Sequence, residues 1–262
     1  MCAKVYAYSE SLDVAKAVGA LVIKSQNKAL ESGSTFKIAL SGGSLGKVLQ
    51  KALVADKDLA SQVKWDKWEV YFSDERIVPF ASEDSNYGLF KNLVLDTLPE
   101  NSPKPKVYTI DEDLVTGKGG QLEGADASKD QEIAARYQKS LPSDAKLDLI
   151  LLGCGPDGHT CSLFPGHKLL QERTELISYI SDSPKQPPRR ITFTFPVLEK
   201  ADSIAFVAEG AGKAPILKEI FGDKNSQLPS KLVNDITTGV AVSWFVDHSA
   251  IEGVEGISVS KY

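Results

Sequence analysis

The chain has 262 residues, of which 42% are hydrophobic and 25% charged, a composition typical of a globular protein with a sizeable core. Its formal net charge is −5 and it has no dense cluster of Lys or Arg, so we expect no nucleic-acid partner. No apolar run approaches the roughly 20 residues of a membrane span, so we expect no membrane association.

Strands and helices are expected to alternate through the first quarter of the chain. A strand over residues 4–8 precedes a helix that Ser11 can cap and that Gly33 can end. The next strand, residues 36–40, leads through the turn at 41–44 into a second helix running toward Val54. The apolar side of the first helix comprises Leu12, Ala15, Val18, Val22 and Ala29.

The middle of the chain continues this alternation. Residues 68–72 (WEVYF) alternate like a strand and end in the polar run at 73–76. A helix is expected from Asp84 toward Leu98, where Pro99 helps to end it. A short strand at 107–110, a polar and glycine-rich surface loop at 111–128 and a helix at 131–140 complete this part.

The second half opens with an apolar run at 147–152, bounded by glycine, which is typical of a strand buried on both faces. A Pro-rich loop at 183–188, strands at 191–195, 203–208 and 240–246, and a helix opening at 210–213 and reaching Phe221 follow. The whole pattern predicts an α/β fold: a single Rossmann-like domain, residues 1–262, with a mostly parallel sheet and helices on both faces.

Three cysteines, Cys2, Cys154 and Cys161, are an odd number without disulfide-like spacing, which favours a reducing compartment. The first residues also lack the apolar core of a secretory signal. We therefore expect a cytoplasmic protein. Cys154 and Cys161 form only a loose cluster with His159 and His167, whereas zinc sites show shorter, paired spacings, so we expect no metal.

Residues 153–158 (GCGPDG) match the dinucleotide pattern G-x-G-x-x-G after a strand. That site also needs a helix opening on the glycines, to bring its N-terminus to the pyrophosphate. Pro165 and Gly166 interrupt the segment that follows, so we expect no nicotinamide cofactor.

Residues 42–46 (GGSLG) match the nucleophile elbow G-x-S-x-G between a strand and a helix. The same turn can instead direct the backbone N–H groups of Gly42, Gly43 and Ser44 at a phosphate, and we favour this interpretation. A tight turn without chemistry is the third alternative. The Ser/Thr and spaced glycine of a Walker loop are missing, which argues against a nucleoside triphosphate.

Asp157 and His159 follow the central strand, and a histidine can take a proton from water and later return one to a leaving group. The alternative is a structural turn with His159 exposed. Polar groups also follow two other strands, at 41–44 and 74–76. If these strands are parallel neighbours, the three clusters meet at one rim of the sheet, where ligands of α/β proteins bind.

Two cations complete the candidate site. Arg190 opens an alternating strand, and Lys213 begins a helix behind two glycines. Each alone is more often a solvated surface charge, but with the turn at 41–44 they would form a phosphate clamp.

The motifs together closely resemble the 6-phosphogluconolactonase family over essentially the whole chain. They occur in this order: SGGS at 41–44, SDERIVPF at 73–80, SNYG at 85–88, GPDGHTCSLFPGH at 155–167, SDSPKQPPRRITFTFPVL at 181–198 and GKA at 212–214. The resemblance implies hydrolysis of 6-phospho-D-glucono-1,5-lactone to 6-phosphogluconate, in the oxidative pentose phosphate pathway and without a cofactor.

The resemblance also implies roles for single residues. His159, at the family's DGH histidine, would activate water and then protonate the ring oxygen. Arg76 would assist binding or stabilise developing negative charge. Asp74 and Asp157 lie where the family places polar substrate contacts, and either could serve a given hydroxyl. The implied phosphate-binding residues are Gly42, Gly43, Ser44, Arg190 and Lys213.

Two other functions use a similar pocket. The glucosamine-6-phosphate deaminases of the same superfamily follow their DGH with a segment ending in Glu-Pro, and that Glu supports ring opening; here the corresponding residues are Phe164 and Pro165. A sugar-phosphate sensor would keep Arg190 and Lys213 without needing His159. Such a sensor normally carries a partner-reading module, and no spare segment of this chain suggests one.

Overall fold

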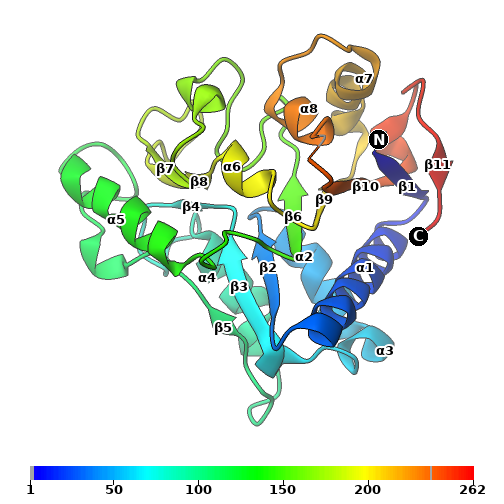
Figure 1. Ribbon diagram of the computed structural model, residues 1–262, viewed down its shortest axis with the longest axis horizontal. Helices are drawn as coiled ribbons and strands as arrows, with labels where there is room; N and C mark the ends of the chain where they lie inside the picture. Colours follow the sequence, from blue (N-terminus) through cyan, green and yellow to red (C-terminus); the bar gives the residue numbers. More distant parts are fainter. Residues whose placement is uncertain (1–2, 237) are drawn as a thin grey trace.

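The computed structural model describes residues 3–236 and 238–262, so Cys2 lies outside the described part. It contains an eight-stranded parallel sheet in the order β11-β1-β10-β9-β6-β2-β3-β5 (Figure 1). The strands are β1 (Lys4–Tyr8), β2 (Phe36–Leu40), β3 (Trp68–Phe72), β5 (Lys106–Val107), β6 (Leu149–Gly153), β9 (Ser203–Ala208), β10 (Ala241–Asp247) and β11 (Val259–Ser260). The predicted α/β fold with a mostly parallel sheet is confirmed.

Helices connect these strands and are of very different lengths. The α-helices are α1 (Ser11–Ser32), α2 (Leu45–Gln50), α3 (Lys57–Ala60), α4 (Asn86–Leu93), α5 (Ala127–Ser140), α6 (Phe195–Leu198), α7 (Ala214–Gly222) and α8 (Pro229–Asn234). The short π or 3-10 turns are η1 (Lys51–Ala55), η2 (Trp65–Lys67), η3 (Leu95–Thr97), η4 (Glu112–Leu114), η5 (Lys168–Gln171), η6 (Ala211–Lys213) and η7 (His248–Ile251). No helix among the described residues is both long and apolar enough to span a membrane.

The sheet is covered on both faces, as its apolar strands require. Along β6, Ile150 and Leu152 belong to one hydrophobic cluster, and Leu149 and Leu151 belong to another, because successive side chains point to opposite faces. The first cluster receives buried side chains from α5, α6, α7 and α8, and the second from α1, α2 and α4. The prediction of helices on both faces is therefore confirmed.

A smaller antiparallel sheet was not predicted. It consists of β4 (Asp74–Arg76), β8 (Arg190–Phe193) and β7 (Ile177–Ile180), in the order β4-β8-β7. The strand expected at 191–195 is thus shifted to 190–193, because Pro196 in the first turn of α6 starts a helix there. With Ser73 alone between β3 and β4, this sheet is attached directly to the rim of the larger one.

Several expected element ends differ in the structure. Ser11 does not cap α1: the N-cap is Glu10, and the side chain of Leu12 is 49% exposed. Helix α4 begins at Asn86 because Ser85 Oγ accepts the Gly88 N–H at 3.0 Å and so caps the first turn. Helix α5 begins at Ala127, four residues earlier than expected, and the helix expected over 210–221 opens as η6 before α7.

Candidate active site

The three polar strand ends lie side by side, because β6, β2 and β3 are consecutive parallel strands of the sheet. Ser41 Oγ, after β2, lies 2.8 Å from Ser73 Oγ, after β3. Ser162 Oγ, in the segment after β6, donates to Asp74 Oδ2 at 2.8 Å. The expectation that these clusters meet at one rim is confirmed.

His159 and Asp157 interact directly at this rim. Asp157 Oδ1 lies 2.5 Å from His159 Nδ1, and Lys185 Nζ lies 3.0 Å from that oxygen and 3.2 Å from that nitrogen. Phe164 stacks on the imidazole, with the ring centroids 4.9 Å apart. The imidazole is thus held on one edge by a carboxylate and on one face by an aromatic ring.

The charges of this cluster follow from burial and from the contacts. Burial lowers the pKa of His159, Asp157 raises it, and Lys185 lowers it further, so that the net shift is downward and the ring is neutral at pH 7. Burial raises the pKa of Asp157, but the hydrogen bonds with His159 and Lys185 outweigh it and lower the pKa to about 2. Asp157 is therefore a carboxylate and can only accept, so the proton of the imidazole lies on Nδ1.

The other ring nitrogen is available for chemistry. His159 Nε2 makes no hydrogen bond with a described residue and is not fully buried. With the proton on Nδ1, Nε2 carries the lone pair. This is the state that a general base needs.

The geometry of the turn that carries His159 requires glycine at two positions. The Gly155 N–H donates to the His159 carbonyl at 2.8 Å, and Gly158 has a φ of 77°. A Cβ at Gly155 would lie 1.9 Å from His159 Nδ1. No helix opens on these glycines, since the next helical element is η5, so the geometry lacks what a dinucleotide site requires.

The turn at 41–44 presents backbone donors. The N–H groups of Gly42, Gly43 and Ser44 donate to no described residue, and Gly43 has a φ of 68°. The Ser44 side chain makes no hydrogen bond with the described residues and therefore lacks the histidine contact of a nucleophile elbow. Its geometry supports an anion-binding turn.

Asp74 and Arg76 lie next to this turn, at different depths. Asp74 is 5% exposed, and its carboxylate is 3.9 Å from Arg76 Nε. Arg76 Nη1 donates to the Asp84 carbonyl at 3.0 Å, while the buried Nε has no hydrogen-bond partner among the described residues. Arg76 therefore keeps donor capacity, whereas Asp74 lies beneath the surface of the site.

The two predicted phosphate cations differ in environment. Lys213 Nζ donates to the Cys154 carbonyl at 2.6 Å, which places it beside the turn of His159. Arg190 is 2% exposed and donates to the carbonyls of Lys185, Gln186 and Pro187. Burial, and secondly Arg76, lower the pKa of Arg190 to about 10. Arg190 thus supports the loop that carries Lys185.

Sequence reasoning missed Lys185 and gave Glu75, a member of the polar run at 74–76, no role of its own. Lys185 lies in the Pro-rich loop of the 181–198 motif, and nothing in its spacing links it to Asp157, 28 residues away. Glu75 is buried, and burial raises its pKa to about 7 although the backbone N–H groups of Tyr87, Asn86 and Arg76 lower it. The sequence signal that could have identified Glu75 was its position between Asp74 and Arg76, in the polar run that follows a strand.

The loose Cys/His cluster separates in the structure. His167 Nε2 lies 3.0 Å from Asp182 Oδ1, whereas His159 pairs with Asp157. Cys154 and Cys161 are buried and free, and burial raises the pKa of both thiols. No group of three His, Cys, Asp or Glu residues in the described ranges is arranged to hold a metal ion.

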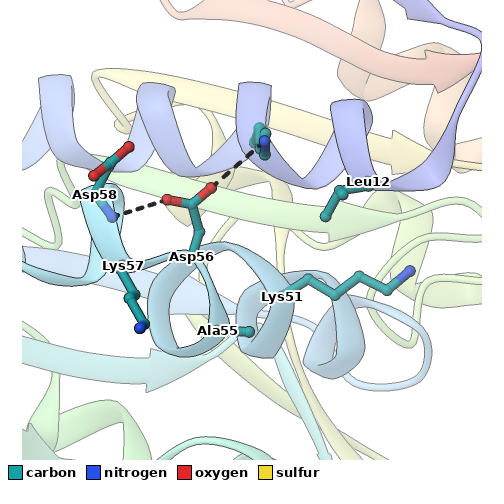
Figure 2. Close-up of a pocket in the computed structure, with 7 residues that line it drawn as sticks. Leu12, Lys51, Ala55, Asp56, Lys57 and Asp58 are labelled. Atoms are coloured by element: carbon teal, nitrogen blue, oxygen red, sulfur yellow. Dashed lines mark hydrogen bonds and ion pairs between the residues drawn. The ribbon is translucent and has the colours of Figure 1, made fainter.

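A surface hollow elsewhere has none of this chemistry. It lies between α1 and the 51–58 segment (Figure 2). Lys16 Nζ there pairs with Asp56 Oδ2 at 3.9 Å. Lys51 Nζ donates to Ser11 Oγ at 3.0 Å. Three lysines and two aspartates line the hollow and no histidine does, so the rim at His159 is the candidate active site.

Comparisons with known proteins agree with the motifs. A family model described as "Glucosamine-6-phosphate isomerases/6-phosphogluconolactonase" matches residues 9–244. The chain is 50% identical to 6-phosphogluconolactonase 3 of Saccharomyces cerevisiae over 251 residues, which cover 95% of this chain and 96% of the relative. It is 41% identical to 6-phosphogluconolactonase of Rattus norvegicus over 246 residues, covering 93% and 90%.

A solved structure shares the fold. The structure of 6-phosphogluconolactonase from Leishmania guyanensis aligns with a TM-score of 0.81 at 22% identity and covers 98% of this chain and 100% of its own. At this identity the likeness is one of fold.

Proposed function

The chain belongs to the glucosamine-6-phosphate isomerase/6-phosphogluconolactonase family, and on that premise we propose that it hydrolyses 6-phospho-D-glucono-1,5-lactone to 6-phosphogluconate. This is the lactone-opening step of the oxidative pentose phosphate pathway. The proposal rests on one observation above all: a neutral His159, oriented by Asp157, lies at a rim with unoccupied backbone donors. We place the reaction in the cytoplasm, since Cys154 and Cys161 are free thiols.

His159 acts as the general base. Nε2 takes a proton from water, and the resulting hydroxide adds to the lactone carbonyl carbon to give a tetrahedral oxyanion. When this collapses, the bond from that carbon to the ring oxygen breaks, and the imidazolium returns its proton to the ring oxygen. Asp157 orients the ring and stabilises the imidazolium through the 2.5 Å contact with Nδ1.

Arg76 stabilises the negative charge that develops on the carbonyl oxygen. It has donors that no described residue occupies, and Asp74, 3.9 Å away, holds its guanidinium in place. A preorganised cation directed at a developing oxyanion lowers the barrier without further reorganisation.

The substrate phosphate binds to the free N–H groups of Gly42, Gly43 and Ser44 together with Lys213. A helix begins directly after that turn, and its N-terminal dipole favours an anion. Arg190 adds positive charge from beneath Phe164, whose ring centroid lies 5.7 Å from the guanidinium. This remote group supplies binding energy that orients the lactone carbonyl toward His159.

The contact between Phe164 and His159 favours the hydrolase over the deaminase activity of the same family. The position beside the imidazole holds an aromatic ring, stacked at 27°, where a deaminase would need a second proton-transfer carboxylate. A hydrolytic reaction needs only one base that later becomes the acid.

The test compares freshly generated 6-phosphogluconolactone, unphosphorylated gluconolactone and glucosamine 6-phosphate, with spontaneous lactone opening subtracted in a no-enzyme control. We expect rapid opening of the phosphorylated lactone, much slower opening of the unphosphorylated one and no ammonia. The variant His159→Ala is expected to lower kcat by about 10²–10⁴-fold while largely preserving substrate binding. His248→Ala, an exposed histidine, is the matched control. Ammonia release, or a His159→Ala variant with normal kcat, would refute the assignment.

A further inference from the structure

Glu75 is a buried carboxylate on which four donors converge. Its Oε1 accepts the N–H groups of Arg76 at 2.8 Å and Asn86 at 2.7 Å. Its Oε2 accepts the Tyr87 N–H at 2.8 Å and Ser85 Oγ at 3.4 Å. The side chain is 2% exposed, so its oxygens are occupied by the protein and unavailable to a substrate. It thus joins β4 to the first turn of α4.

Asn86 extends this connection to the phosphate-binding turn. Its Nδ2 donates to the Asp74 carbonyl at 2.9 Å. Its Oδ1 packs against Gly42 so closely that a Cβ on that glycine would lie 1.8 Å away. One side chain therefore contacts both the strand end that carries Arg76 and the turn at 41–44.

The SNYG motif at 85–88 has no role in the proposed chemistry. The contacts of Glu75 and Asn86 give its residues a structural role. Ser85 caps α4 through the Gly88 N–H, and a Cβ on Gly88 would lie 2.3 Å from the Phe80 carbonyl oxygen. These two residues set the start of α4, and Asn86 and Tyr87 present their N–H groups to Glu75.

We propose that Glu75 is a positioning residue, which acts through Asn86 to set the location of Arg76 relative to the turn at 41–44. This inference rests on the proposed lactone hydrolysis, in which those two elements hold the oxyanion and the phosphate. Burying a carboxylate is costly unless it is hydrogen-bonded. The four hydrogen bonds supply what an apolar residue would not: a defined distance between two elements of the site.

The deciding variants are Glu75→Gln and Asn86→Asp. In Glu75→Gln, an NH₂ group replaces one carboxylate oxygen and faces N–H donors. In Asn86→Asp, an oxygen replaces the Nδ2 donor and faces the Asp74 carbonyl and carboxylate. Glu83→Gln is the matched control, because Glu83 is exposed, lies on the loop before α4 and undergoes the same side-chain substitution.

We expect both variants to lower kcat/KM for the phosphorylated lactone by about 10–100-fold per folded enzyme, as for a misplacement of about 1 Å. Hydrogen exchange is expected to accelerate at residues 41–46 and 84–90. Glu83→Gln should match the wild type in every measurement. A purely structural role would instead change only the melting temperature and the yield.

Wild-type kcat/KM and wild-type exchange in folded Glu75→Gln and Asn86→Asp would overturn the proposal. An inactive wild-type protein would refute the proposed function itself. Hydrogen exchange needs no substrate, so it would still show whether Glu75 holds the two segments together.

Discussion

Replacing Gly155 with alanine tests the geometry of the His159 turn with a single methyl group. A Cβ at this position would lie 1.9 Å from His159 Nδ1 and 2.6 Å from Asp157 Oδ1. The backbone of Gly155 does not have a positive φ, so the methyl group adds a steric conflict without backbone strain. The perturbation is therefore confined to the histidine and its carboxylate.

The size of the effect follows from these distances. The imidazole must retreat by about 1.5 Å to restore an ordinary contact of 3.4 Å with the new methyl group. It cannot do so without disrupting the 2.5 Å contact with Asp157 and the stacking on Phe164. A misplacement of about 1 Å can cost about 10² in rate, so we expect kcat to fall by about 10²–10³-fold. Overpacking should lower the unfolding free energy by about 1–3 kcal/mol.

The assay is steady-state lactone hydrolysis, with urea unfolding measured in parallel. Gly153→Ala is the matched control, because a Cβ at Gly153 meets no atom within 4 Å. It should retain wild-type kcat. A folded Gly155→Ala variant with wild-type kcat would refute the claim that the Asp157–His159 contact drives the reaction.

Two further predictions concern pH and stability. Lys185→Gln removes a cation that lowers the pKa of His159, so the acid limb of log kcat/KM should move to higher pH. The exposed control Lys168→Gln should leave this limb in place. An unmoved limb in Lys185→Gln would contradict the assigned contact. Asp130→Asn weakens a fully buried pair with Arg189 and should lower the unfolding free energy by about 3–5 kcal/mol in urea titrations. The exposed Lys91–Asp96 pair provides the control, and Asp96→Asn should unfold close to wild type; equal effects of both variants would contradict the role of burial.

The sequence by itself predicted most strands of the larger sheet and the rim where the polar strand ends meet. The strands at 4–8, 36–40, 68–72 and 203–208 have the predicted bounds, because short apolar runs between glycine and polar turns leave few alternatives. The rim could also be anticipated, since parallel strands place all their carboxyl ends together. Asp157 and His159 are two residues apart, so their contact is local and readable from the chain.

Only the tertiary structure decided which charges act on these groups. The Pro-rich loop brings Lys185 to Asp157, and α4 brings Asn86 to Gly42, through contacts between segments far apart in the chain. The same holds for the two consecutive arginines. Arg189 pairs with Asp130, whereas Arg190, the first residue of β8, donates to the carbonyls of residues 185–187. Successive side chains along an extended backbone point in opposite directions, so the two arginines diverge. Periodicity reveals that two such residues diverge, but the partners that each meets depend on the packing of distant segments, which no local pattern encodes.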